Sequence, residues 1–235
     1  SASVYGVTTY ADVVLADSPL AFWQLNETSG TTAKDSSGNG YNGTYTGGFA
    51  LGQQGLPTGG ASAKFDGSSG CVEAPLCTTA TASVTLEAWM NFGGAAALGG
   101  AFVALGNGTT GYSMGVGTQG NTNPGAYNQA GVNFVSLYQY ESWNFPASPV
   151  DIPTTGWHHC VIVIGSNKQT TYYLDGVQVG TNSNSTIVTP SGNSFMATDS
   201  INSGRYYGGL LCNCAVYNYV LSPTRIQAHY NAGIG

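Results

Sequence analysis

The chain carries very little charge. Only 7% of its 235 residues are Asp, Glu, Lys or Arg, whereas soluble domains average roughly 25%. Five basic residues stand against eleven acidic ones, which gives a formal net charge of −6. Five cations cannot neutralise a track of phosphates, so the composition excludes nucleic acid as a partner. Anionic membrane surfaces are excluded for the same reason.

Long apolar runs are also lacking. No run reaches the length needed to span a membrane, so we expect no membrane insertion. The opening Ser1-Ala2-Ser3 has neither the charged nor the apolar region of a signal peptide. We therefore expect either that a leader has been removed or that the protein leaves the cell another way, for instance inside a virus particle.

Glycine and small polar residues take the place of the missing charges. Gly accounts for 35 residues, about twice its average usage, and Ser, Thr and Asn are abundant. This composition is typical of a turn-rich β protein. With 42% hydrophobic residues, the length suits one large all-β domain as well as two small ones.

Several segments predict strands. The run Trp157–Ile164 is almost wholly apolar, as in a strand that is buried on both sides. Asp175-Gly176 separates two further strand-like runs and predicts a two-residue hairpin turn. Residues 83–91 and 132–140 alternate between apolar and polar positions. Many short strands with Gly, Asn and Ser turns predict a two-sheet antiparallel jelly-roll sandwich.

Two helices are expected at the ends of this sandwich. The first covers Tyr10–Ala16, after a cap at Thr8 or Thr9, and stops before Pro19. The second covers residues 222–231, with Ser222 as its cap and Gly233 at its end. No internal repeat or linker is visible, so we expect a short N-terminal arm (1–9) and a single domain (10–235).

These landmarks together resemble the laminin-G-like, concanavalin A-like jelly-roll domains of bacterial and phage surface proteins. The loop 25–43 (LNETSGTTAKDSSGNGYNG) is similar to a characteristic motif of that group. The resemblance covers about residues 10–231 and implies a jelly roll whose members mostly bind and only in some branches catalyse. Its other landmarks here are the segments at 10–23, 64–67, 86–89, 156–159, 174–176 and 215–222.

The resemblance also implies a structural calcium site, from which this chain departs. Asp35, with Asn39 and Gly43 close by, offers the oxygen ligands that calcium prefers. The family's last strand usually adds an acidic pair, but the matching positions here are residues 211–213 (Leu-Cys-Asn). The alternative is that Asp35 binds the amides of its own loop in an Asx-type turn.

The five cysteines leave their pairing open. They are Cys71, Cys77, Cys160, Cys212 and Cys214, and an odd number leaves at least one free thiol. Cys212 and Cys214 are expected to face the same side of one strand, where they cannot readily bridge each other. Structural thiols, or a disulfide from Cys71 or Cys77 to this pair, are preferred over a metal site.

No catalytic arrangement is visible. Glu73, Glu87 and Glu141 are isolated from one another, without the paired spacing of glycoside hydrolases. His158 and His159 are neighbours on a strand and should point to opposite faces, so a packing or hydrogen-bonding role is expected for both. The remaining histidine, His229, is expected in solvent on the terminal helix. We therefore predict a protein that is not an enzyme.

Aromatic side chains are the best sign of binding. Sugar rings stack on flat aromatic rings while Asn, Gln and Asp side chains bind the hydroxyls. The alternative is contact with neighbouring subunits, since Tyr and Trp are enriched at protein interfaces. Trp23, Trp89 and Trp157 are expected in the core. The candidate ligand-binding residues are Tyr138, Tyr140, Trp143, Phe145, Tyr206 and Tyr207.

The sequence favours a non-enzymatic adhesion or glycan-binding module on the exterior of a phage virion or a bacterial surface. Its partner would be a carbohydrate. The first alternative is a structural protein that decorates or cements an assembly by contacting neighbouring subunits. The second is a glycosidase-like jelly roll.

Overall fold

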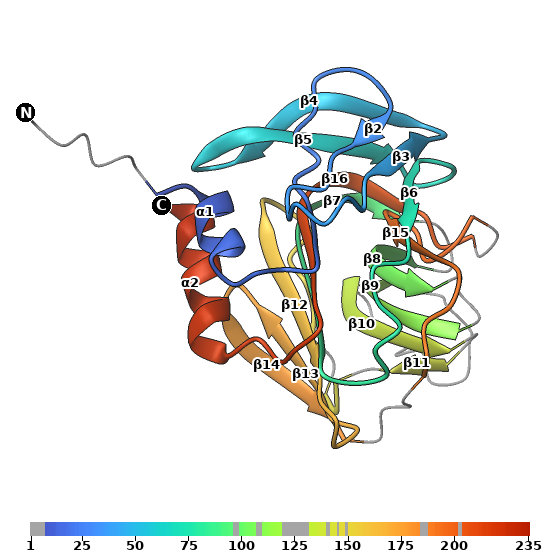
Figure 1. The fold of residues 1–235 in the computed structure, drawn as a ribbon, viewed down its shortest axis with the longest axis vertical. Coiled ribbons are helices and arrows are strands. Elements are labelled where there is room, and N and C mark those ends of the chain that lie inside the picture. The colour runs from blue at the N-terminus through green and yellow to red at the C-terminus, as the bar shows by residue number, and fades with distance from the viewer. Residues whose placement is uncertain are drawn as a thin grey trace, which may run out of the picture.

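The chain folds into two antiparallel β-sheets packed face to face, with two short helices on the outer face of one sheet (Figure 1). This computed structural model describes residues 8–95, 99–106, 110–118, 132–139, 142–144, 146–148, 150–183, 188–201 and 204–235. The architecture confirms the predicted jelly-roll sandwich.

Sheet A carries the helices. Its path runs β14-β13-β12-β7-β16-β5-β4, and β1 pairs separately with β16. The central β7 and β16 are long and mostly buried, as expected for strands covered on both faces. The bounds are β14 Val177–Asn182, β13 Thr170–Leu174, β12 His158–Ile164, β7 Val84–Ala95, β16 Tyr207–Tyr217, β5 Gly59–Asp66, β4 Phe49–Leu56 and β1 Ala21–Trp23.

Sheet B faces it across the core and runs β11-β10-β9-β8-β15-β6-β3-β2. The strand predicted over 132–140 is β10, which ends at Gln139. The bounds are β11 Ser142–Asn144, β10 Val132–Gln139, β9 Thr110–Thr118, β8 Gly100–Gly106, β15 Asn193–Met196, β6 Cys71–Pro75, β3 Gly43–Thr46 and β2 Thr32–Ala33.

Two hydrophobic clusters lie on opposite faces of sheet A. The inner cluster fills the space between the sheets and includes Trp23, whose indole N–H donates to the Tyr41 carbonyl at 2.7 Å. The outer cluster lies under the helices and includes Trp89, which stacks on Tyr230. Trp157 is partly buried against the outer cluster. Trp23 and Trp89 are fully buried, as expected.

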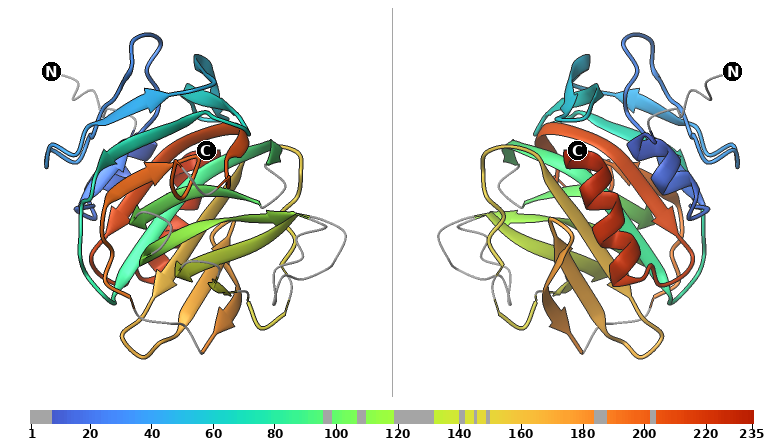
Figure 2. Two further views of the ribbon diagram at one scale, coloured as in Figure 1. Left: turned by 90° about the vertical axis from the view of Figure 1, so that its right-hand side faces the viewer. Right: turned by 90° about the vertical axis from the view of Figure 1, so that its left-hand side faces the viewer.

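Both helices pack on the outer face of sheet A (Figure 2). Helix α1 spans Tyr10–Leu15, and Thr9 and Asp12 form a capping box at its start. Helix α2 spans Pro223–Ile234, with Ser222 as its cap. It runs three residues beyond the predicted end. Gly233 does not end the helix but lies inside it, at a position where a Cβ would collide with the Trp89 ring.

The hairpin between β13 and β14 confirms the Asp-Gly prediction. Asp175 has φ of 52° and Gly176 has φ of 77°, the positive values that a tight two-residue turn requires. The Asp175 carboxylate also accepts from the His159 backbone N–H at 2.9 Å. The turn is therefore tied to the start of β12.

A β-bulge in β16 overturns the expectation for its two cysteines. The register shifts between Cys212 and Ala215, and Asn213 between the cysteines has φ of 54°. Cys212 consequently joins the outer cluster and Cys214 the inner one. The prediction that they share a side was wrong, since an inserted residue breaks the alternation of a strand.

All five cysteines are buried free thiols. Burial raises the pKa of the Cys77 thiol to about 12, and the pKa of Cys212 is raised for the same reason. They act as small apolar side chains. Among the described residues, neither helix is long and apolar enough to cross a membrane.

Candidate functional site

The aromatic segment predicted to bind ligand forms the edge of sheet B. Strands β10 and β11 pair with Leu137 opposite Trp143 and Gln139 opposite Ser142, and the register shifts at Tyr138 between them. Strand β11 ends the sheet. Tyr138 and Trp143 thus belong to one bulged edge hairpin. Tyr140 and Phe145 lie outside the described residues.

The second predicted pair, Tyr206 and Tyr207, divides between surface and core. Tyr207 is fully buried, and its hydroxyl donates to the Asn91 carbonyl at 2.8 Å. Its ring meets Phe102 edge-on inside the sandwich, so it has no face for a ligand from solvent. Tyr206 is partly exposed, and its hydroxyl donates to the Ile201 carbonyl at 2.9 Å.

The loop around Asp35 has the geometry of the Asx-type alternative. The carboxylate accepts from the backbone N–H groups of Phe22, Ser37 and Tyr41 at 2.9–3.0 Å, and from the Ser37 hydroxyl at 2.9 Å. Burial by itself raises the pKa of Asp35, but these four donors outweigh it and hold the pKa below its ordinary value. The carboxylate is therefore ionised and saturated with donors.

The predicted metal ligands do not converge on a cation. Asn39 directs its Nδ2 at the Leu20 carbonyl, 2.9 Å away, and Gly43 begins β3, where its backbone joins the sheet. N–H groups occupy the positions that calcium would need on Asp35. Within the described ranges, no group of three or more His, Cys, Asp or Glu side chains could hold a metal. The residues present do not fit a calcium ion.

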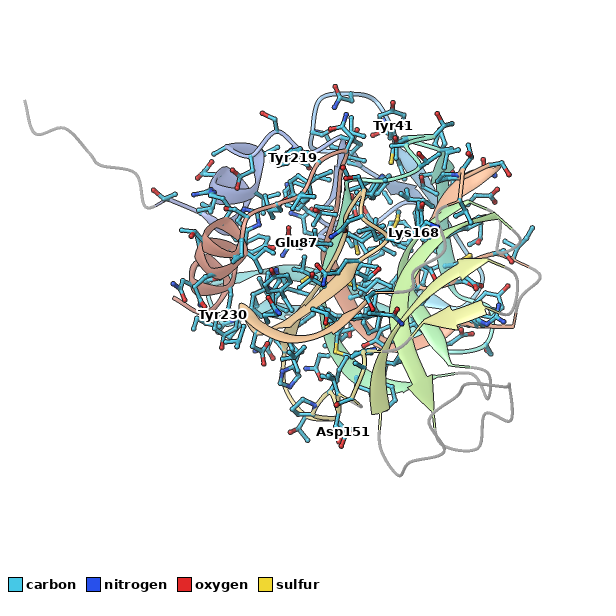
Figure 3. The ribbon with its side chains drawn as sticks, turned by 90° about the horizontal axis from the view of Figure 1, so that it is seen from below. Tyr41, Glu87, Asp151, Lys168, Tyr219 and Tyr230 are labelled. Carbon is cyan, nitrogen blue, oxygen red and sulfur yellow. The ribbon has the colours of Figure 1, made fainter. Side chains whose placement is uncertain are left out.

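The densest polar cluster of the described chain lies under the two helices. Glu87 in β7 is fully buried and is labelled, with Tyr230 of α2, in Figure 3. Its carboxylate accepts from the Tyr10 hydroxyl of α1 at 2.6 Å, the Tyr217 hydroxyl at 2.9 Å and the His159 Nε2–H at 2.8 Å. One carboxylate thus connects sheet A with α1.

Helix α2 reaches the same carboxylate through His229. Its Nδ1 lies 3.0 Å from both Glu87 oxygens, and its Nε2 lies 2.7 Å from Asp17 Oδ2. Both ring nitrogens face carboxylates, so both donate a proton and the ring is an imidazolium. Asp17 also accepts from the Arg225 Nε at 2.7 Å. The result is a chain of alternating charges, Glu87–His229–Asp17–Arg225.

The pKa values of this cluster follow from its charges. Burial alone raises the pKa of Glu87 and lowers that of His229. The mutual attraction of the two groups and their hydrogen bonds reverse both effects. The pKa of Glu87 is consequently held well below its ordinary value and that of His229 is raised. Burial, followed by the nearby Glu87 charge, raises the pKa of the Tyr10 and Tyr217 hydroxyls.

This cluster corrects one histidine prediction and agrees with another. His229 is fully buried rather than solvated, because α2 turns that face onto the sheet. His158 and His159 diverge as expected. His158 Nδ1 lies 2.8 Å from Asp175 Oδ2, whereas His159 points to Glu87.

The partners of Glu87 are the residues that sequence reasoning missed. In the sequence, Asp17 is only one position of the segment at 10–23, and His229 lies 142 positions from Glu87. A charged or polar residue within an apolar strand indicates a buried polar cluster, since such residues are rarely buried without partners. The sequence does not show which distant side chains supply those partners.

The two packed sheets define an antiparallel jelly-roll sandwich. The sequence profile of the concanavalin A-like lectin/glucanases superfamily matches residues 66–227, more than half of the chain. The chain therefore belongs to this superfamily, which confirms the resemblance seen in the sequence. No curated protein sequence matched the chain.

Solved structures share the fold at low sequence identity. Domain 4 of AbnA, an extracellular GH43 arabinanase from Geobacillus stearothermophilus solved with arabinotriose, is 18% identical. The match covers 90% of this chain and 98% of that domain, with a TM-score of 0.63. Trypanosoma rangeli sialidase, solved with 2,3-difluorosialic acid, is 16% identical over 91% of this chain and 33% of its own, with a TM-score of 0.63.

A third similar structure is the binding domain of Paraclostridial Mosquitocidal Protein 1. It is 11% identical, with a TM-score of 0.66 over 93% of this chain and 53% of that domain. The chain thus spans about a third of the sialidase and about half of this binding domain. At these identities the likeness concerns the fold alone.

Proposed function

We propose that this chain is a non-enzymatic carbohydrate-binding module that acts outside the cell, on a bacterial surface or a virion exterior. Residues 10–235 would form one domain, preceded by an arm over residues 1–9. The fold match to a domain solved with arabinotriose, which covers nearly all of that domain, supports a carbohydrate ligand.

The structural roles of the acidic side chains are the observation that supports a non-enzymatic function. Glycoside hydrolysis needs two carboxyl groups that face a substrate. In the described chain, most of the acidic side chains instead hold the fold together. Asp12 caps α1, Asp66 accepts from the amides of its own turn, and Asp199 pairs with Arg205. Glu27 accepts from Tyr45, and Glu87 lies fully buried in its cluster.

The ligand would meet the β10–β11 edge hairpin, through the predicted set Tyr138, Tyr140, Trp143 and Phe145. Aromatic rings there would stack on sugar rings while neighbouring amides bind hydroxyls. The bulge at Tyr138 supports this placement, since bulges at sheet edges often re-aim side chains for function.

A glycan array tests the proposal. We expect defined glycan binding that is lost in Trp143→Ala and kept in Tyr219→Ala, which removes an exposed aromatic ring from the loop between β16 and α2 instead. Absence of any binding would contradict the proposal. Hydrolysis of β-glucans that is abolished by substitution of one Glu would contradict the non-enzymatic part.

A cementing role is the second candidate, and the loop between β15 and β16 favours it. The buried ion pair of Asp199 and Arg205, with 3.0 Å between Oδ2 and Nη1, holds this loop. The loop presents Ile201, which is 52% exposed, beside Tyr206. An apolar side chain next to a tyrosine suits a protein contact. Light scattering should then show association that Ile201→Asp abolishes, whereas a strictly monomeric chain would contradict this role.

A further inference from the structure

A groove of about 630 Å³ is lined by residues of α1, α2 and the β4–β5 hairpin. These elements are labelled in Figure 1. None of its described lining residues has a charged side chain. Its volume lies within the range of roughly 300–1,000 Å³ typical of small-molecule sites. The lining consists of residues 8–11, Gln24, Asn26, Leu56, residues 58–61, Asn213, Asn231, Ala232 and Gly235.

The groove coincides with a split in sheet A. Along one side of β16, residues 208–211 pair with β5, whereas residues 214–216 pair with β1. The bulge lies between these two stretches, and there Asn213 donates its backbone N–H to the Gln24 carbonyl at 3.0 Å. The bulge therefore places an asparagine, with φ of 54°, in the wall of the groove.

Hydrogen bonds made outside the opening of the groove hold its walls in place. The Thr58 hydroxyl donates to the Gly233 carbonyl at 3.1 Å and ties the β4–β5 turn to α2. Gln24 donates to the Ser36 hydroxyl and accepts from Asn26 Nδ2. Gln24 is thus a support that orients Asn26.

Three amide groups along the groove keep hydrogen-bonding capacity. Asn231 Oδ1 accepts from Gln227, which leaves its Nδ2 as a donor. Asn213 uses Nδ2 toward the Cys212 sulfur, and Asn26 uses Nδ2 toward Gln24. Both have an Oδ1 without a partner among the described residues. The groove therefore offers one amide donor and two amide acceptors beside the apolar side chain of Leu56.

We propose that this groove is a second binding site, which takes a neutral, hydroxyl-rich ligand of the size of a short oligosaccharide. Uncharged amides bind hydroxyl groups by donating and accepting. A charged ligand would meet no charged side chain in the described lining and would lose its hydration. The site is separate from the β10–β11 edge, which lies at the end of the other sheet.

NMR of the side-chain amide groups tests this site. The probes are arabinotriose and maltotriose as neutral saccharides and sialic acid as a charged one. We expect the neutral trisaccharides to shift the side-chain signals of Asn26 and Asn231, with sialic acid leaving them in place. No shift with either trisaccharide would overturn the proposal.

Variants separate the groove from the edge hairpin. Asn213→Gly removes the amide while keeping the positive φ that glycine tolerates, and Asn26→Ala removes an exposed side chain. Each should weaken trisaccharide binding about tenfold, as expected for the loss of a hydrogen bond of roughly 1.4 kcal/mol. Asn218→Ala, at an exposed asparagine outside the groove, should have no effect.

The groove and the proposed function can fail separately. Binding that survives both groove substitutions but is lost in Trp143→Ala would overturn the groove site and leave the edge hairpin supported. Binding that is lost in the groove variants and unchanged in Trp143→Ala would support the groove and count against the edge hairpin.

Discussion

His229 and Glu87 are 142 positions apart in the chain, yet the imidazole Nδ1 lies 3.0 Å from both oxygens of the carboxylate. The pair is fully buried. It joins α2 to the central strand β7, and the Tyr10 hydroxyl joins α1 to the same carboxylate. Both helices therefore depend on one ionised group.

Glu87→Gln should lower the free energy of unfolding by about 3–5 kcal/mol, because the buried imidazolium of His229 then loses one of its two carboxylate partners and keeps only Asp17. Urea denaturation followed by circular dichroism measures the change. Asp151→Asn is the matched control, since Asp151 is exposed, and a change within about 0.5 kcal/mol is expected there. Equal effects of the two substitutions would contradict the role given to Glu87.

Stability should fall as the pH rises through the raised pKa of His229. The folded state binds this proton more tightly than the unfolded state, whose histidine pKa is about 6.5. The contribution is thus complete below about pH 6.5 and is lost above it, as the pH passes the folded pKa. Buried thiols add a further fall at alkaline pH, so the difference between wild type and His229→Gln isolates the histidine. A difference that does not change with pH would contradict this account.

In acid, the same cluster makes the stability fall as the pH is lowered. The pKa of Glu87 is lowered in the folded state, so its contribution is present above about pH 4.3, its unfolded value, and is lost as the pH falls further. Unfolding midpoints in urea between pH 2 and pH 5 should show this loss in wild type and a smaller one in Glu87→Gln. Parallel curves would argue against it.

Gly233→Ala should destabilise the protein even though alanine favours helices. A Cβ at this position would lie 2.2 Å from Trp89 Cζ2, so α2 would have to move off the sheet. Overpacking of this kind costs about 1–3 kcal/mol, more than the gain of roughly 1 kcal/mol in helix propensity. Tryptophan fluorescence during thermal unfolding measures the change, and a raised midpoint would contradict the close contact.

The native protein should not react with a thiol reagent. All five cysteines are buried, and burial raises the pKa of each thiol, which suppresses the reactive thiolate. Ellman's reagent should label none of them in buffer and all five in guanidinium chloride. Fewer than five in denaturant, without reductant, would reveal a disulfide.

Calcium should leave the unfolding midpoint unchanged. The donors around Asp35 already satisfy its carboxylate, so neither added calcium nor a chelator should shift a thermal denaturation curve. Asp35→Ala should be destabilising in both conditions, because it removes the acceptor of four hydrogen bonds. A rise in midpoint with calcium that depends on Asp35 would contradict the Asx-type role.

Apart from the fold class and the superfamily, the features predicted correctly from the sequence are local ones. The Asp175-Gly176 turn depends on backbone angles that those two residue types favour, and Thr9 and Ser222 cap helices that begin directly after them. The errors at Cys214 and His229 have a tertiary cause. A bulge and the docking of a helix depend on residues far along the chain, which periodicity does not reveal.

The candidate binding residues divide in the same way. Tyr206 and Tyr207 are adjacent aromatic residues, and the sequence alone does not distinguish the surface position from the buried one. In the fold, Tyr207 opens a strand and turns into the core, whereas Tyr206 stays in the loop. In the sequence, Asn213 differs from its neighbours only as a position where the family usually has an acid. Its place in the groove follows from the pairing of β16 with both β5 and β1.

The shared anchoring of the two helices has a mechanical consequence. A pulling force applied beyond α1 and one applied beyond α2 would both load the same carboxylate. Detaching one helix would remove a hydrogen-bond donor from Glu87 and weaken the attachment of the other helix. Under tension, the two helices should therefore come away from sheet A in one step.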